Sequence, residues 1–402
     1  MNRTGYDQRG LVALILPAFF FFFSTLGNLA FPLTNTESLA VIVVFFALIL
    51  LSALLTSNNA ILRKKVSYVS LFATGAVIVS QLLAGLAIGF NFGTYLFLFS
   101  LILGAFAILS IFDGEVLLRA FYVSAIWLAL VGWPIELLRL NSYQFATGYS
   151  LNPLGWRWMG IQSHPNIAGI TMAFLFCIAV IKYRNYVVAF VAVLNLVLAE
   201  HRGGLLGIVL VLGVVTILDF PKWTIKAKTL ACLGWLIIAA VTPFTLVSRL
   251  GTDDLSTGRV GIWDLCQRQL QKSPWFGSGP NTITRLFGQD LYSATTPFHC
   301  HSQFLDDLVN YGLLAGLIPT TLLLVLLVRA FKKRDLTILG ILMALLACWL
   351  VESPFRLFAT QPSAFINLFV LLMFSSAFGT ASKEPELQES RAIRIPPNLS
   401  DK

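Results

Sequence analysis

The sequence predicts an all-α polytopic membrane protein with about 12 transmembrane helices and one large outer loop between helices 9 and 10. Hydrophobic residues make up 57% of the 402 residues and charged residues only 12%. The mean hydropathy is +0.80, so the chain is far more apolar than a soluble domain of this length requires. Apolar runs long enough to cross a hydrocarbon layer of about 30 Å recur along most of the chain.

The apolar runs define the predicted spans, and the whole chain, residues 1–402, is predicted to be one integral membrane domain. The run after Arg3 and Arg9 imitates a signal peptide, but no convincing small-residue cleavage site follows, so it is taken as the first helix. The predicted spans are Leu11–Gly27, Ser38–Leu55, Ser67–Phe90, Tyr95–Phe112, Val116–Leu138, Ile167–Ile181, Tyr186–Ala199, Gly204–Asp219, Thr229–Val247, Leu308–Val328, Leu336–Val351 and Ala364–Phe378.

The distribution of basic residues predicts the orientation, because lysine and arginine remain mostly on the cytoplasmic side of membrane proteins. With the N-terminus inside, nineteen of the 28 lysines and arginines fall on cytoplasmic segments. Both termini are therefore predicted to be cytoplasmic, with residues 380–402 forming a disordered tail. This topology accounts for most of the net charge of +9 without a nucleic-acid partner.

The same topology places every histidine on the outer side, where an active site is therefore sought. The outer loop, residues 248–304, also holds two cysteines, Cys266 and Cys300. In an oxidising compartment these can form a disulfide, but two cysteines in one loop need not face each other, so the sequence leaves the bridge open. The histidines are His164, His201, His299 and His301.

Two motifs of the outer loop contain glycine. In STGRVGIW, a serine or threonine cap predicts a helix with Arg259 in its first turn. A cation there opposes the helix dipole, which favours an anionic ligand, although an ion pair with Asp253, Asp254 or Asp264 explains it equally well. In FGSGPNT, an ordinary turn is favoured over a phosphate-binding loop because no lysine motif follows.

A third motif, FHCHSQFLDD, joins the outer loop to the tenth span and places His301 and Ser302 at the mouth of that span. An imidazole with a pKa near neutrality suits the removal of a proton from a sugar hydroxyl. The pair His299 and His301 is also a candidate metal site, but no further ligand spacing supports one, and no metal is predicted.

A fourth motif, AEHRGGLLG, lies between two closely spaced spans and puts Arg202 at the outer membrane boundary. An arginine there is costly unless it reaches lipid phosphates or pairs with a partner, and the sequence does not separate these alternatives. Gly203 and Gly204 would let the backbone approach a bulky ligand closely.

Taken in order, SHPNIAG, AEHRGGLL, STGRVGIW with PWFGSGP, and HSQFLDDLVNYGLLAG resemble the O-antigen ligase and polymerase superfamily of bacterial envelope proteins. The resemblance covers residues 163–316. It implies a GT-C-like, inverting, metal-independent glycosyltransferase without a cofactor in the bacterial inner membrane, with its active site facing the periplasm. The implied donor is a glycan on undecaprenyl pyrophosphate. The implied acceptor is a sugar of the lipid A core in ligases, or another lipid-linked repeat unit in polymerases.

The resemblance also implies roles for individual residues. Arg202 and Arg259 match arginines that contact the donor pyrophosphate, and His301 matches the histidine that activates the acceptor hydroxyl. Guanidinium groups bind phosphate oxygens in a forked geometry and keep their charge near lipid. The family usually has asparagine where this chain has Ser302, and the small residue after Gly312 appears as Ala315, with Gly316 one position later. The residues expected to support the site are Ser302, His299, His164, Asn166 and Glu200.

A transporter with twelve spans is the alternative from another class. Transporters place ionisable groups or broken helices near the middle of the bilayer, often in two related halves. Here the interiors of the spans are nearly free of charge, and the longest loop does not divide the chain in two. The enzyme is therefore favoured, while the choice between ligase and polymerase stays open because both share these motifs.

Overall fold

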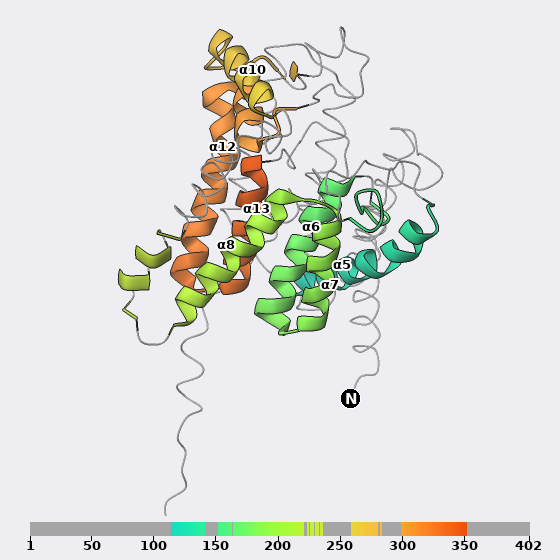
Figure 1. Cartoon of the computed structure of the whole chain (residues 1–402). Helices are drawn as coiled ribbons and strands as arrows, with labels where there is room; N and C mark the ends of the chain where they lie inside the picture. The colour runs from blue at the N-terminus through green and yellow to red at the C-terminus, as the bar shows by residue number, and fades with distance from the viewer. Residues whose placement is uncertain are drawn as a thin grey trace, which may run out of the picture.

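The computed structural model describes residues 114–140, 152–162, 164–220, most of 223–235, 259–279, 282–283 and 299–351. All regular elements in these ranges are helices (Figure 1). An all-α membrane fold is thus supported where the chain is described. The first four predicted spans, the twelfth, most of the ninth, about half of the outer loop and the tail 380–402 lie outside these ranges.

Five described helices coincide with the fifth to eighth and the eleventh predicted spans, but those at the seventh, eighth and eleventh are shorter than a full membrane span. Within the described ranges, two unbroken helices are long and apolar enough to cross a membrane, Leu117–Leu137 and Pro165–Tyr183. A third qualifies if the bent pair Gln303–Leu314 and Gly316–Lys333 is counted as one span. The elements are α5 (Gly114–Leu137), α6 (Pro165–Cys177), which continues as the π-helical turn η2 (Ile178–Tyr183), α7 (Tyr186–Leu198), α8 (Arg202–Asp219), α10 (Arg259–Lys272), α12 (Gln303–Lys333) and α13 (Leu336–Val351).

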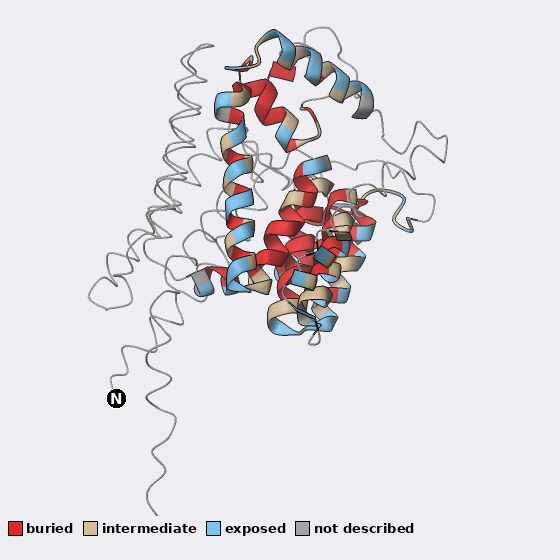
Figure 2. Ribbon diagram, turned by 90° about the vertical axis from the view of Figure 1, so that its left-hand side faces the viewer, coloured by how far each residue is buried: buried red, intermediate tan, exposed pale blue. Residues whose placement is uncertain are grey.

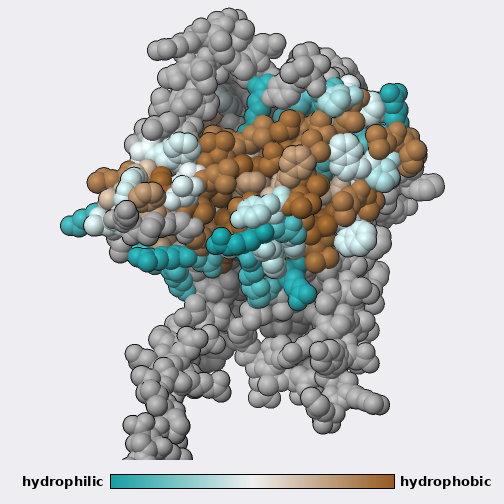
Figure 3. Space-filling model, turned by 60° about the horizontal axis from the view of Figure 1, so that its bottom comes forward, coloured by the Kyte–Doolittle hydropathy of each residue, from teal (hydrophilic) through white to brown (hydrophobic). Residues whose placement is uncertain are grey.

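Helix α13 lies at the centre of the packing and contacts α6, α8 and α12. Close approach depends on small residues: a Cβ on Gly207 of α8 would lie 2.9 Å from the Cα of Ala344 on α13. Such small-residue contacts are typical of helices that associate in a bilayer. The buried residues gather where these helices meet (Figure 2), and one outer face of the described helices is broadly apolar with hydrophilic residues along its border (Figure 3).

The chain direction places two lysines at the far ends of helices that begin beside predicted site residues. Helices α6 and α8 begin near His164 and Arg202, and α12 begins after His301. The opposite ends of α6 and α12 lead into the turns that contain Lys182, an ion-pair partner of Glu115, and Lys333. These site residues therefore lie at one end of the helices and Lys182 and Lys333 at the other.

One prediction needs correction, because the tenth span is not a continuous helix over Leu308–Val328. Gly312 has φ 69° and ψ −175°, outside the helical region, and the segments Gln303–Leu314 and Gly316–Lys333 meet at an angle of 113°. Only glycine adopts this backbone conformation readily. The short segment that follows His301 therefore bends away from the apolar part of the helix.

Candidate active site

The turn between α7 and α8 presents Arg202 as the first residue of α8. His201 caps this helix: its Nδ1 accepts a hydrogen bond from the amide of Gly204 at 2.9 Å. Its side chain is buried against Gly169 of α6, where an added Cβ would lie 2.2 Å from the Cβ of His201. Glu200 has a left-handed φ of 53°, which turns the chain sharply into the cap. Packing and capping together fix where α8 begins, and so where Arg202 stands.

A polar network joins this turn to the start of α6. The Nε of Arg157 donates to the carbonyl of Ala199 at 3.0 Å, and its Nη2 donates to Oδ1 of Asn166 at 2.8 Å. His164 caps α6 by accepting from the amide of Asn166 at 3.1 Å. Asn166 is thus linked to Ala199 in the Arg202 turn by two hydrogen bonds of Arg157, and His164 joins this network through the amide of Asn166. Sequence reasoning did not select Arg157.

The segment that supplies Arg157 is held by buried groups. The carboxylate of Glu136, at the end of α5, accepts from the amides of Met159 and Gly160 at 2.7 and 2.8 Å and from the indole of Trp156 at 2.7 Å. Asn152 donates to Oε1 of Glu200 at 3.1 Å. The three bonds to Glu136 satisfy a buried carboxylate that would be costly to bury without partners. The bond from Asn152 connects Glu200 to the same segment.

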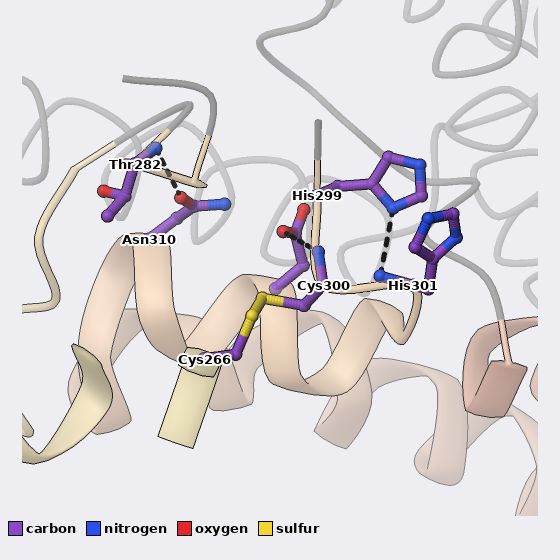
Figure 4. The surroundings of a disulfide bond; sticks show 7 residues. Cys266, Thr282, His299, Cys300, His301 and Asn310 are labelled. Atoms are coloured by element: carbon purple, nitrogen blue, oxygen red, sulfur yellow. Dashed lines mark hydrogen bonds between the residues drawn. A yellow bond between two sulfur atoms is a disulfide. The ribbon is translucent and has the colours of Figure 1, made fainter. Parts of the chain in front are cut away.

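The His299–His301 turn lies directly before α12 (Figure 4). The amide of His301 donates to Nδ1 of His299 at 3.0 Å, and the two imidazole rings lie with centroids 4.1 Å apart. His301 has a left-handed φ of 48°. Ser302 is the N-cap residue of α12, and no hydrogen bond from its side chain caps the helix. The two histidines therefore have different roles in the turn. The side chain of His299 accepts the hydrogen bond that closes the turn, and His301 donates that bond from its backbone amide.

A disulfide between Cys266 and Cys300 ties this turn to α10, so the bridge that the sequence left open is present. Both cysteines are fully buried and pack with Ile283 and Val309. The amide of Cys300 also donates to Oδ1 of Asp306 at 3.1 Å. The residue just before His301 is thus fixed by a covalent bond to one helix and a hydrogen bond to the next.

Residues 274–279, which include the start of the FGSGPNT motif, form backbone hydrogen bonds across the break in α12. We call this segment the clasp. The amides of Ser278 and Gly279 donate to the carbonyls of Val309 and Asn310 at 2.8 and 2.9 Å, and the amide of Leu313 donates to the carbonyl of Pro274 at 2.8 Å. These bonds satisfy backbone groups that the break at Gly312 would otherwise leave unpaired. Because the two glycine-loop amides are already used, the structure agrees with a turn and argues against a phosphate-binding loop.

Glycines make this clasp possible at three crossing points. A Cβ on Gly277 would lie 2.5 Å from the carbonyl carbon of Asn310, and one on Gly312 would lie 2.3 Å from that of Trp275. Gly316 packs against the backbone of Asp307, where an added Cβ would lie 2.5 Å from its carbonyl oxygen. Gly316, the glycine that follows Ala315 in this motif, therefore allows the segments before and after the bend to come into contact.

Arg259 is the first residue of α10, as the motif predicts, and the helix continues through Trp263, Leu265 and Leu270. Of the carboxylates considered as its partner, Asp264 is paired with Arg268 at 2.6 Å on the exposed face of α10. The side chain of Arg259 and residues 253–254 lie outside the described parts. The structure therefore places the backbone of Arg259 at a helix start, at the opposite end of α10 from the clasp.

Two carboxyl groups, Asp306 and Asp307, are buried on the first turns of α12. Asp307 accepts from Nε2 of Gln303 at 2.8 Å. Burial raises the pKa of Asp307 well above its usual value, with a further increase from the neighbouring charge of Asp306. In the described ranges, no three histidine, cysteine or acidic side chains gather in a way that would hold a metal ion.

Comparison with known families bears on the whole set of motifs. Residues 187–320 match the sequence profile of the O-antigen ligase family. The resemblance to the O-antigen ligase and polymerase superfamily is thereby confirmed. No curated protein matches the chain. The matched segment includes Arg202, Arg259 and His301, and it supports a ligase-type or polymerase-type membrane function acting on lipid-linked glycans.

The structure thus groups the predicted site residues other than Arg259 into two sets. One set surrounds the start of α8 and comprises Arg202, Glu200, His164 and Asn166, joined through Arg157. The other surrounds the start of α12 and comprises His299, His301 and Ser302, held to α10 by the disulfide and the clasp. Arg157 and Asp306 were missed, because their roles lie in hydrogen bonds to the carbonyl of Ala199 and the amide of Cys300, which residue type and spacing do not specify. The position of Arg157 just ahead of SHPNIAG was the available signal.

Removing the disulfide is expected to destabilise the outer segment by about 3–4 kcal/mol, because the bridge closes a loop with a sequence separation of 34. The double variant C266S/C300S should unfold at a lower temperature in detergent, and the wild-type protein should do the same after reduction. If reduction lowers the unfolding temperature of the double variant by as much as that of the wild type, the effect does not come from this bridge. Thiol labelling with and without prior reduction checks that the bridge forms.

Proposed function

We propose that this protein is an O-antigen ligase that transfers a glycan from undecaprenyl pyrophosphate to a sugar of the lipid A core. The transfer takes place at the periplasmic face of the bacterial inner membrane, and both termini are cytoplasmic. The observation that carries the proposal is the family match over residues 187–320, which contains Arg202, Arg259 and His301 in the expected order. A polymerase of the same superfamily would use the same residues with a lipid-linked repeat unit as acceptor.

The helix ends supply a physical reason for pyrophosphate binding. Arg202 and Arg259 each occupy the first position of a helix, α8 and α10. A cation there opposes the partial positive charge of the helix end, and a bound anion relieves that repulsion. A pyrophosphate contacting both arginines would therefore stabilise the local structure while being bound through forked hydrogen bonds.

The reaction joins the acceptor oxygen to the anomeric carbon of the donor while the bond from that carbon to the pyrophosphate oxygen breaks. Attack from the opposite face inverts the anomeric configuration. His301 accepts the proton of the acceptor hydroxyl, and undecaprenyl pyrophosphate departs with the electron pair. Arg202 and Arg259 stabilise the charge that develops on the leaving group, a role in which preorganised donors lower the barrier without a divalent ion.

Deleting the gene and analysing the cell envelope tests this function. Loss of capped lipopolysaccharide with accumulation of long lipid-linked chains supports a ligase, whereas caps of a single repeat unit identify a polymerase. An unchanged envelope under conditions where the gene is expressed would contradict both. Purified protein given donor and acceptor should then form the same glycosidic bond, and this activity should persist in the presence of a chelator.

Replacing Arg202 by alanine is expected to lower transfer by about 10²- to 10³-fold, the usual effect of removing one preorganised donor to developing charge. Lysine should restore part of the activity, because it keeps the charge but not the forked geometry. Transfer by purified protein and donor binding are the measurements. Arg119, an exposed arginine on α5, provides the matched control, and R119A should remain active. Near-normal transfer by R202A would remove Arg202 from the mechanism.

A further inference from the structure

Two large aromatic side chains protrude from the clasp. Trp275 is 59% exposed and Phe276 is 64% exposed. Their backbone is nevertheless held firmly: the carbonyl of Trp275 accepts from the amide of Leu314 at 3.3 Å, and the amide of Gly277 donates to the carbonyl of Ser273 at 3.0 Å. Two adjacent exposed aromatic rings on a turn whose backbone is fixed by hydrogen bonds mark a candidate site for a partner that covers apolar surface.

The backbone contacts of this pair place it where α12 begins its apolar part. Leu314, which bonds to Trp275, is itself 60% exposed. Beyond Gly316 the helix exposes a series of apolar side chains that includes Leu317, Leu324, Val325 and Val328. The aromatic pair therefore lies at the upper end of an apolar helix face.

The length of that apolar part fixes the level of the pair in a membrane. The segment Gly316–Lys333 is about 27 Å long at about 1.5 Å per residue, close to the hydrocarbon thickness of about 30 Å. Its far end carries Lys332 and Lys333, which belong at the other lipid–water boundary. If these lysines mark one boundary, Trp275 and Phe276 lie close to the opposite one.

We infer that Trp275 and Phe276 insert into the outer lipid–water interface and anchor the clasp there. Aromatic side chains are enriched at this depth because they combine a large apolar body with a preference for the headgroup region. Lys272, exposed in the last turn of α10, adds a cation three residues before the pair that suits a lipid phosphate. The partner is bilayer phospholipid.

The anchor has a consequence for the site. Because the segment Gln303–Leu314 meets the spanning part at 113°, it runs along the membrane surface when the bend is held at the interface. The His299–His301 turn at its start is then kept close to the level of the lipid headgroups. This inference does not depend on the proposed function and holds whichever reaction the protein catalyses.

Photocrosslinking in liposomes tests the anchor. The probe is p-benzoylphenylalanine introduced at Phe276, where it keeps an aromatic ring, and at Gln271, an exposed position on α10, as the matched control. In vesicles of labelled phosphatidylethanolamine and phosphatidylglycerol, the variant at 276 should form several-fold more lipid adduct than the variant at 271. Equal adducts, or adducts to polyprenyl lipid, to a second copy or to another protein in place of phospholipid, overturn the inference.

A second measurement does not depend on the crosslinker. The fluorescence of the wild type minus that of W275F reports on Trp275, and lipids brominated near the headgroup end of the acyl chain should quench this difference several-fold more than aqueous iodide does. Stronger quenching by iodide would place Trp275 in water and overturn the inference.

Discussion

Replacing His301 by asparagine is expected to lower glycan transfer by about 10²- to 10⁴-fold, the usual contribution of a general base. The choice of asparagine follows from the backbone, because His301 has a φ of 48° and asparagine tolerates this left-handed conformation better than alanine. The variant therefore removes the imidazole while adding little strain. Transfer should be measured with purified protein at saturating acceptor, alongside the unfolding temperature, which should stay near that of the wild type.

His299 supplies the matched control for this prediction. Its Nδ1 accepts the amide of His301 at 3.0 Å, a contact between residues two apart that an asparagine carbonyl also makes. H299N should therefore keep the turn and most of the activity, whereas H299A should lose part of both. Near-normal transfer by H301N would exclude His301 as the base. An equal loss in H299N and H301N would show that both imidazoles are needed for the chemistry.

The sequence predicted the helices of the described part well because each depends on local patterns. The runs at Tyr186–Ala199 and Leu336–Val351 become helices with nearly the same ends. Apolar composition over the width of a bilayer leaves the backbone few alternatives to a helix, since every amide must bond within the chain. The start of α10 at Arg259 likewise follows from a short local motif.

The break in α12 could not be predicted in the same way. The run after Leu308 contains Gly312, Gly316 and Pro319, but glycine and proline are common in membrane spans and do not by themselves specify a bend. The bend exists because Pro274, Ser278 and Gly279 supply partners for the opened backbone from outside the run. A pattern read along one segment cannot reveal a hydrogen-bond partner from another, and for the same reason the sequence left the Cys266–Cys300 bridge open.

For the candidate site, residue types were predictable and contacts were not. His164 and Asn166 were selected from a motif, yet their link to the Arg202 turn passes through Arg157, whose two bonds reach Ala199 and Asn166. The structure also gives the paired histidines different roles, because the ring of His299 accepts a hydrogen bond from the backbone amide of His301. Such a division depends on turn geometry, which the spacing of two histidines does not specify.

Replacing Gly312 by alanine is expected to open the clasp and to lower both stability and transfer strongly. The backbone conformation at φ 69° and ψ −175° costs a residue with a side chain about 1–3 kcal/mol. The clash adds to this, since the new Cβ would lie 2.3 Å from the carbonyl carbon and oxygen of Trp275. Thermal unfolding in detergent, protease cleavage of the outer segment and glycan transfer are the three measurements.

Two other glycines separate the contributions of strain and clash. Gly155 has a positive φ of 75° with no atom within 4 Å of an added Cβ, so G155A reports backbone strain alone. Gly261, within α10, has neither a positive φ nor a close neighbour, so G261A should be neutral or stabilising by up to about 1 kcal/mol. A loss in G312A that exceeds the loss in G155A includes the clash of the new methyl group with the backbone of Trp275 and Gly277. If G312A and G155A lose equal stability, the clasp accommodates the added methyl group. The position of His301 relative to the span would then not depend on the close contact at Gly312.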